Sequence, residues 1–272
     1  MSHGSSPLNE PLPPPDLIDT HCHLDGEEFA SDLDVVLQRA AHSGVRRWIN
    51  VGYSPGRWQT SLDLTSAYPG LSCMLGVHPG HADEWNSETA SELRRLVTTG
   101  VPVAIGEIGL DFYRGETNVV EQVAAFTAQL SMAHEIGLPI SIHMRNAEEM
   151  VIDVLNSQPS LPVLLFHSFE GSDRLVDWIL QNDAYIGVGG LATRKKAAAL
   201  RAHINRVGLD RIVLETDSPY LVPTGFKHRR NTPESIPFIL RIVANLFDVD
   251  QTVVADRTTE TACQIFGSLP RS

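Results

Sequence analysis

The sequence predicts an α/β fold of the TIM-type (β/α)8 barrel class. Eight short β-rich runs alternate with longer amphipathic stretches, which is the order expected of a parallel sheet with crossover helices. The runs are nearly continuous in apolar character, as expected of strands that are covered on both faces. A chain of 272 residues with 42% hydrophobic content is long enough to bury the core of such a barrel.

The expected strands follow one another along most of the chain. Reactive side chains in a closed barrel lie at the C-terminal ends of its strands, so the residues at these ends are the candidates for a functional site. The predicted strands occupy residues 17–21, 47–51, 72–77, 101–105, 139–143, 162–167, 184–188 and 211–216.

The stretches between the strands have helical periodicity. Residues 28–42 place apolar side chains on one face, and Gly44 follows as a stop signal. Residues 117–136 repeat this pattern, and Gly137 closes it. Beyond the last strand, two further helices are predicted at 233–247 and 252–266.

The domain prediction is a single barrel domain at residues 16–272, preceded by a disordered, proline-rich lead-in at residues 1–15. The lead-in contains too little apolar surface to offset the entropy of ordering it. It also lacks the basic-then-apolar order of a secretory signal. No apolar run approaches the ~20 residues that a membrane-spanning helix needs, so we expect no membrane association.

Charge and cysteine content limit the classes of partner and compartment. The formal net charge of -12 disfavours non-specific binding of duplex nucleic acid, although it leaves room for a local basic patch. The three cysteines, Cys22, Cys73 and Cys263, have no CxxC spacing, which argues against a disulfide framework or a thiolate metal site. We therefore expect reduced cysteines and a cytoplasmic location.

Histidines and acids recur where the predicted strands end. His21 and His23 close the first strand, and residues two apart on a strand share a face, so both imidazoles project together while Cys22 points the other way. Four histidines and two carboxylates are enough for two metal ions that share a bridging oxygen ligand. The remaining members of this set are Glu107, His143, His167 and Asp217.

Seven short motifs, taken in order, resemble the TatD-type metal-dependent hydrolases, a deoxyribonuclease family of the amidohydrolase-like superfamily. The resemblance spans residues 16–266 and implies a barrel of the metal-dependent hydrolase type. The motifs are Asp-Thr-His-Cys-His-Leu at 19–24, Gly-Val-His-Pro at 76–79, Gly-Glu-Ile-Gly-Leu-Asp at 106–111, Ile-His-Met-Arg at 142–145, His-Ser-Phe at 167–169, Glu-Thr-Asp-Ser-Pro-Tyr-Leu at 215–221 and Arg-Asn-Thr-Pro at 230–233.

The resemblance also implies the ligands of two divalent metal ions. One ion would be held by His21, His23 and Asp217, and the other by His143 and His167, with Glu107 bridging the two. Such ligands suit zinc, manganese or magnesium. Paired ions would lower the pKa of a bound water toward ~7 and clamp the oxygens of a phosphodiester, and Asp217 would manage the proton of that water.

Several further residues are candidates for substrate contact. His78 would point into the mouth of the barrel, where it either contacts substrate, protonates the leaving group or makes a structural hydrogen bond. Arg145 follows His143 by two residues and offers its fork of donors to a phosphate. Lys227, Arg229 and Arg230 lie in the long connection after the eighth strand, where barrels commonly build a phosphate site.

Two surface features each have two interpretations. The Arg194-Lys195-Lys196 cluster either extends the phosphate site or is a solvated surface. Aromatic residues near the mouth either stack on bases or pack within a lid. They are Phe112, Tyr113, Phe169, Tyr220 and Phe226.

The leading prediction is a TatD-like metal-dependent deoxyribonuclease that removes nucleotides from the 3′ end of single-stranded or end-accessible DNA or RNA. No obligate protein partner is expected. An alternative is a hydrolase of small-molecule amides, lactones or aminoacyl esters, such as an aminoacyl-tRNA deacylase. Many small-molecule amidohydrolases bridge their metals with a carboxylated lysine, so Glu107 favours the nuclease. A non-catalytic metal-binding scaffold is disfavoured by the complete ligand set.

Overall fold

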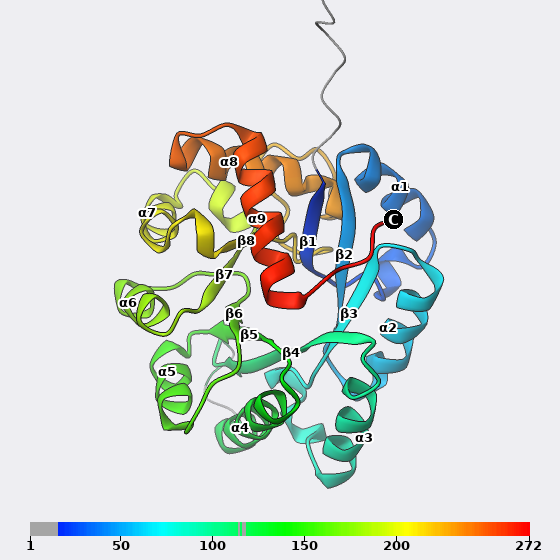
Figure 1. Ribbon diagram of the computed structural model, residues 1–272, viewed down its shortest axis with the longest axis vertical. Coiled ribbons are helices and arrows are strands. Elements are labelled where there is room, and N and C mark those ends of the chain that lie inside the picture. Colours follow the sequence, from blue (N-terminus) through cyan, green and yellow to red (C-terminus); the bar gives the residue numbers. More distant parts are fainter. Residues whose placement is uncertain (1–15, 114, 116–117) are drawn as a thin grey trace, which may run out of the picture.

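The structure is a computed structural model that describes residues 16–113, 115 and 118–272. Eight parallel strands form a single sheet in the order β1 to β8, and the helices surround it (Figure 1). This arrangement confirms the predicted (β/α)8 barrel. The strands are β1 Leu17–Cys22, β2 Val45–Gly52, β3 Leu71–Leu75, β4 Pro102–Asp111, β5 Ile140–Arg145, β6 Leu164–Phe166, β7 Tyr185–Val188 and β8 Ile212–Leu214.

Helices and short 3-10 turns connect the strands. Within the part of the chain that the structure describes, no helix combines the length and apolar character needed to cross a lipid bilayer. The α-helices are α1 Leu33–His42, α2 Pro55–Ala67, α3 Ser87–Val97, α4 Val119–Ile136, α5 Glu148–Ser157, α6 Asp173–Gln181, α7 Ala198–Val207, α8 Ile236–Phe247 and α9 Gln251–Phe266. The 3-10 turns are η1 Glu27–Phe29, η2 Pro79–Glu84, η3 Gly190–Thr193, η4 Leu209–Arg211 and η5 Pro233–Ser235.

Three predicted helices begin later than expected, and for the helix predicted at 233–247 the reason is that residues 233–235 form the separate turn η5 before α8 begins at Ile236. The helix predicted from residue 28 is interrupted, because Phe29 is buried in the separate turn η1 and α1 begins at Leu33. Phe29 and Leu33 are four residues apart, so apolar periodicity alone could not reveal the break between them. The helix predicted at 117–136 begins at Val119. Residue 117 and the lead-in at 1–15 lie outside the described residues.

Strand β4 is longer than the sequence indicated, and this changes the position of Glu107. The strand was expected to end at Ile105, but it continues to Asp111, so Glu107 lies within the strand and not at its end. Ile105 pairs with Ile140 and Ile108 pairs with Ile142, which leaves an extra residue on β4 between the two pairs. Such a bulge changes which side chains face the barrel interior.

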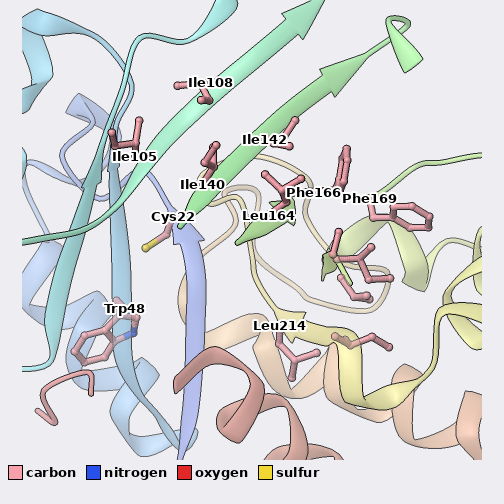
Figure 2. Packing of buried hydrophobic residues seen from close by; sticks show 14 of the residues in the cluster. Cys22, Trp48, Ile105, Ile108, Ile140, Ile142, Leu164, Phe166, Phe169 and Leu214 are labelled. Carbon is pink, nitrogen blue, oxygen red and sulfur yellow. The ribbon is translucent and has the colours of Figure 1, made fainter. Parts of the chain in front are cut away.

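The core has two layers. The outer layer packs the strands against the surrounding helices, and Figure 2 shows part of it, including Ile108, Ile142 and Phe166 on β4, β5 and β6. The inner layer gathers side chains from six strands, including Ile18 and Met74, together with Ile265 and other residues of α9. Helix α9 therefore closes the N-terminal end of the barrel, and it crosses the barrel in Figure 1.

The barrel closes between its first and last strands at the opposite end. An isolated parallel bridge joins Cys22 to Ser218. The backbone N–H of His23 donates to the Ser218 carbonyl at 2.8 Å, and that of Asp217 donates to the His21 carbonyl at 2.9 Å. Closure of the barrel thus brings the last predicted ligand, Asp217, beside the first two.

Candidate metal centre

The first group of candidate ligands lies where β1 meets the end of β8. His23 Nε2 lies 3.2 Å from Asp217 Oδ1, and His21 Nε2 lies 3.8 Å from the same oxygen. The side chain between the two histidines points the other way, because Cys22 is part of the outer core. The three ligand atoms lie within 4.8 Å of one another, a geometry that could hold a metal ion.

The second group lies on β4, β5 and the end of β6. Glu107 Oε1 lies 2.5 Å from His143 Nδ1 and 2.7 Å from His167 Nε2. The other carboxylate oxygen, Oε2, lies 3.5 Å from His21 Nε2 in the first group. The two oxygens of Glu107 therefore face different groups of histidines, which is the arrangement required of a bridging carboxylate.

The electrostatics of this centre favour bound positive charge. Burial alone would raise the pKa of Glu107, but the surrounding histidines, His167 foremost, outweigh it and hold this pKa well below its ordinary value. Burial alone would lower the pKa of His167, but the Glu107 carboxylate outweighs it and raises this pKa well above its ordinary value. The same negative potential that retains a proton attracts a divalent cation.

Unpartnered ring nitrogens test whether the residues fit a metal ion. Both nitrogens of His21 and the Nδ1 atoms of His23 and His167 are buried without a hydrogen-bond partner among the described residues. A buried polar atom in this state costs about 1–3 kcal/mol, unless something else satisfies it. Imidazole and carboxylate ligands are suited to a divalent ion, so the residues present fit the metal that the sequence implied.

Two further carboxylates lie behind the histidines. Asp111 Oδ2 lies 3.0 Å from His143 Nε2, and Glu215 Oε1 lies 3.6 Å from His167 Nδ1. Glu215 Oε1 also accepts a hydrogen bond from the Ser168 backbone. By distance alone each of these acids could also complete a ligand group, Asp111 with His78 and His143, Glu215 with His21 and His167. Their position on the far ring nitrogen is that of a residue that orients a ligand histidine.

His78 lies beside Glu107 in a defined tautomer. The Gly80 backbone N–H donates to His78 Nδ1 at 2.9 Å, so the proton of the neutral ring is on Nε2. That atom lies 3.8 Å from Glu107 Oε1. Burial lowers the pKa of His78 to about 3. This geometry favours a neutral donor that contacts substrate over an imidazolium that protonates the leaving group.

The basic residues predicted to contact substrate differ in whether their side chains are exposed or already paired within the protein. The Arg230 guanidinium pairs with both oxygens of Asp32, at 2.7 and 3.1 Å, and lies 4.4 Å from the centroid of Phe29. Its donors are therefore engaged with Asp32, the residue before α1, and its guanidinium covers Phe29 of η1. Lys227 and Arg229 are exposed, as is the predicted contact Arg145 at the end of β5.

The second basic cluster lies on the neighbouring loop. Arg194, Lys195 and Lys196 are exposed after turn η3. The Thr224 backbone N–H donates to Thr193 Oγ1 at 2.8 Å and ties the two loops together. Both basic segments therefore belong to the same side of the barrel mouth.

Two residues at the mouth were missed by the sequence analysis. Tyr53 follows β2, and its ring centroid lies 5.5 Å from that of His23. Arg57, in the first turn of α2, lies 5.8 Å from the centre of the Tyr53 ring. Tyr53 stands directly after a strand end, so the rule that found the metal ligands would have found it too. It was missed although aromatic residues that follow other strands were considered.

A (β/α)8 barrel with imidazole and carboxylate ligands gathered at its C-terminal mouth defines the class of metal-dependent barrel hydrolases. Residues 18–267 match the family described as "TatD related DNase", and the chain belongs to that family. The resemblance inferred from the seven motifs is thus confirmed.

Curated relatives and solved structures agree with this assignment. The chain is 36% identical over 258 residues to the 3′-5′ ssDNA/RNA exonuclease TatD of Erwinia amylovora, covering 92% of this chain and all of the relative. It is 31% identical to an uncharacterized metal-dependent hydrolase, YabD, of Bacillus subtilis, covering 92% of this chain and 98% of the relative. The structure of YJJV, a TatD homologue from Escherichia coli K12, superposes with a TM-score of 0.87 at 29% identity, covering 93% of this chain and 98% of that chain.

Proposed function

We propose that the chain is a metal-dependent exonuclease that hydrolyses phosphodiester bonds of single-stranded DNA or RNA from the 3′ end. The observation that carries the proposal is the placement of Glu107, whose two oxygens face His21 on one side and His143 and His167 on the other. The activity named for the Erwinia amylovora relative supports the choice of substrate.

The ligand residues have distinct roles in this proposal. His21, His23 and Asp217 would hold one divalent ion, His143 and His167 would hold a second, and Glu107 would be shared between them. Divalent ions bound there supply Lewis-acid activation of the phosphate and of the attacking water.

The remaining groups bind the phosphate and move protons. In hydrolysis the water oxygen bonds to phosphorus, and one P–O bond to a nucleotide breaks. Asp217 accepts the proton that the water loses, and the leaving oxygen takes its proton from solvent. His78 donates from Nε2 to a phosphate oxygen, and Arg145 offers its guanidinium to a neighbouring phosphate.

The distribution of charge supports a nucleic-acid substrate over a small amide or lactone. The chain carries a formal net charge of -12, yet exposed basic residues lie on both loops at one side of the mouth. They are Arg194, Lys195, Lys196, Lys227 and Arg229. Apart from Arg145 at the end of β5, this positive charge is concentrated on one side of the site, which suits a short strand end better than a long duplex.

One experiment separates the two candidate functions. Metal-stripped protein is incubated with and without divalent ions on end-labelled single strands with free or blocked 3′ ends, alongside an aminoacyl ester and a simple lactone. We expect metal-dependent shortening of strands with free 3′ ends and no such shortening of blocked strands. A Glu107→Ala protein should be inactive on all substrates. Turnover of the ester or lactone without any cleavage of nucleic acid would overturn the proposal in favour of the small-molecule hydrolase.

We propose two ions per chain, of zinc, manganese or magnesium, in a cytoplasmic protein. Elemental analysis of the purified protein measures the stoichiometry directly, and a single bound ion that supports full activity would contradict the bridging role of Glu107.

A further inference from the structure

The structure separates the aromatic residues near the mouth into two kinds. Phe169 is only 4% exposed and packs in the core, and Phe226 packs against Phe238 at a centroid distance of 5.6 Å. Tyr113 is 59% exposed and Tyr220 is 55% exposed. Among the residues that the structure describes, these two are the most exposed aromatic side chains.

The two tyrosines stand on opposite sides of the candidate metal centre. Tyr113 follows the end of β4, and Tyr220 lies in the connection that follows β8. Strands β4 and β8 are four positions apart in an eight-stranded barrel, so they face each other across the mouth. The ligands Glu107 on β4 and Asp217 after β8 lie between them.

Tyr113 is held by contacts that leave much of its ring exposed. Its backbone N–H donates to Asp111 Oδ1 at 2.8 Å, and Asp111 in turn contacts His143. The Arg145 guanidinium carbon lies 3.6 Å from the centroid of the Tyr113 ring. One face of the ring is therefore covered by a cation, while more than half of the residue remains exposed.

Tyr220 is fixed in a similar way on the other side. Its backbone N–H donates to the Asp217 carbonyl at 2.8 Å. Its ring centroid lies 5.9 Å from that of His23, with the rings inclined at 64°. Each tyrosine is thus positioned through a residue of the metal centre, so an aromatic group stacked on it would lie beside the reacting phosphate.

We propose that Tyr113 and Tyr220 are stacking platforms for two unpaired nucleobases, one on each side of the scissile phosphate. The proposal rests on the nuclease function proposed above and deepens it by naming the feature of the substrate that is recognised. Bases in a duplex are already stacked and paired, so the platforms select single strands. Stacking accepts any base, so they select without regard to sequence.

Stacking also provides affinity that an acidic protein cannot obtain from charge alone. With a net charge of -12, long-range attraction to the phosphate backbone is weak. Each base that stacks on an aromatic side chain strengthens binding about five- to 150-fold. Arg145 couples the two effects, because its planar group stacks on Tyr113 while its edge donors remain able to reach a phosphate.

Binding without cleavage gives the first test. A set of short single strands is made in which each strand carries 2-aminopurine at a different position near the 3′ end. Stacking quenches the fluorescence of 2-aminopurine, and each strand is titrated into metal-stripped protein. We expect quenching at two positions. Tyr113→Ala should abolish it at one position and Tyr220→Ala at the other, while the Tyr113→Phe and Tyr220→Phe proteins keep it. Quenching that both alanine variants retain would overturn the proposal.

Cleavage gives the second test. Each Tyr→Ala change should lower kcat/KM for an ordinary single strand about five- to 150-fold, and much less for a strand that lacks the base at the matching position. Val253→Ala, an exposed apolar side chain on α9 at the other end of the barrel, is the control and should have no effect. Equal losses on strands with and without that base would show a role other than stacking.

The outcomes for the two proposals are distinguishable. Wild-type protein that binds and quenches single strands but does not cleave them with any divalent ion contradicts the nuclease function alone. Wild-type protein that cleaves single strands while both alanine variants act at the same rate contradicts the stacking platforms alone. Both side chains are exposed, so thermal unfolding of the variants should match that of the wild type and exclude misfolding.

Discussion

The Glu107 carboxylate reaches two groups of histidines because the inward and outward alternation of side chains along β4 is shifted by one residue just before Glu107. Ala104 belongs to the inner core, so strict alternation along β4 would place Glu107 outside the barrel and Ile108 inside. The extra residue between Ile105 and Ile108 reverses this order, and Ile108 packs in the outer core instead. A one-residue irregularity thus turns the Glu107 carboxylate toward both groups of candidate ligands.

A second single residue, Asp111, should control metal affinity through His143. Asp111→Asn keeps the oxygen that accepts the Tyr113 N–H but removes the negative charge beside His143 Nε2. We expect metal affinity to fall about 10- to 100-fold, as is usual when a carboxylate behind a ligand histidine is lost. Titration of metal-stripped protein measures this, and unchanged affinity would show that Asp111 does not orient the ligand.

Neighbouring arginines in the loop after β8 should behave differently. Arg229 is exposed, so Arg229→Ala should lower the slope of log affinity for single strands against log salt by about 0.7. Arg230 pairs with Asp32 and covers Phe29, so Arg230→Ala should lower the free energy of unfolding by about 1–2 kcal/mol. Salt titrations and denaturant unfolding separate the two effects, and the reverse pattern would contradict this assignment.

At the scale of elements, β4 and β5 approach so closely that only glycine fits at one point. A Cβ on Gly109 would collide with the His143 carbonyl oxygen, and Gly109 has a φ of 144°. The absence of a side chain there lets β4 lie against the strand that carries His143. The metal centre therefore depends on backbone packing as well as on its ligands.

Replacing two glycines, one at a time, by alanine tests this dependence. Gly109→Ala should lower the free energy of unfolding by about 1–3 kcal/mol or more and weaken metal binding, because His143 must shift. Gly56→Ala is the matched control, since Gly56 lies in α2 with open space around it. It should leave stability equal or raise it by up to about 1 kcal/mol. Denaturant unfolding measures the stability of both proteins. Equal changes in the free energy of unfolding would contradict the close approach of β4 and β5 at Gly109.

At the scale of the whole molecule, the barrel divides stability and chemistry between its two ends. One end is closed by α9, whose Ala262, Ile265 and Phe266 pack among side chains from six strands. The other end gathers buried histidines and carboxylates, and several of the histidine ring nitrogens have no hydrogen-bond partner among the described residues. The stabilisation that apolar packing provides at one end can therefore offset the destabilisation caused by unpartnered polar groups at the other.

Metal should consequently stabilise the whole fold. A divalent ion at a hundredfold excess over its Kd should raise the free energy of unfolding by about 2.7 kcal/mol, because it binds only the folded state. Phe266→Ala should lower the free energy of unfolding by about 3–5 kcal/mol, and metal should still stabilise this protein by the same amount as the wild type. Metal should not stabilise the Glu107→Gln protein. Thermal unfolding with and without chelator measures the effect, and an increment that survives in Glu107→Gln would contradict the bridging role.

The sequence predicted the elements better than it predicted their contacts. All eight strands occur near their expected positions, and His21 and His23 face the same carboxylate, as their spacing predicted. The engagement of Arg230 could not be foreseen, because its partner Asp32 lies 198 residues away in the chain. Apolar periodicity likewise could not distinguish the buried Phe169 from the exposed Tyr113.

The sequence by itself determined the barrel class, the family and the residue types that meet at the mouth, because alternation and strand-end position are local properties of the chain. The tertiary structure decided which way those residues point and which of them remain free. The bulge in β4 turns Glu107 inward, and closure of β1 against the end of β8 brings Asp217 to His21. Both depend on distant segments packing together, and contacts of this kind cannot be read from local sequence pattern.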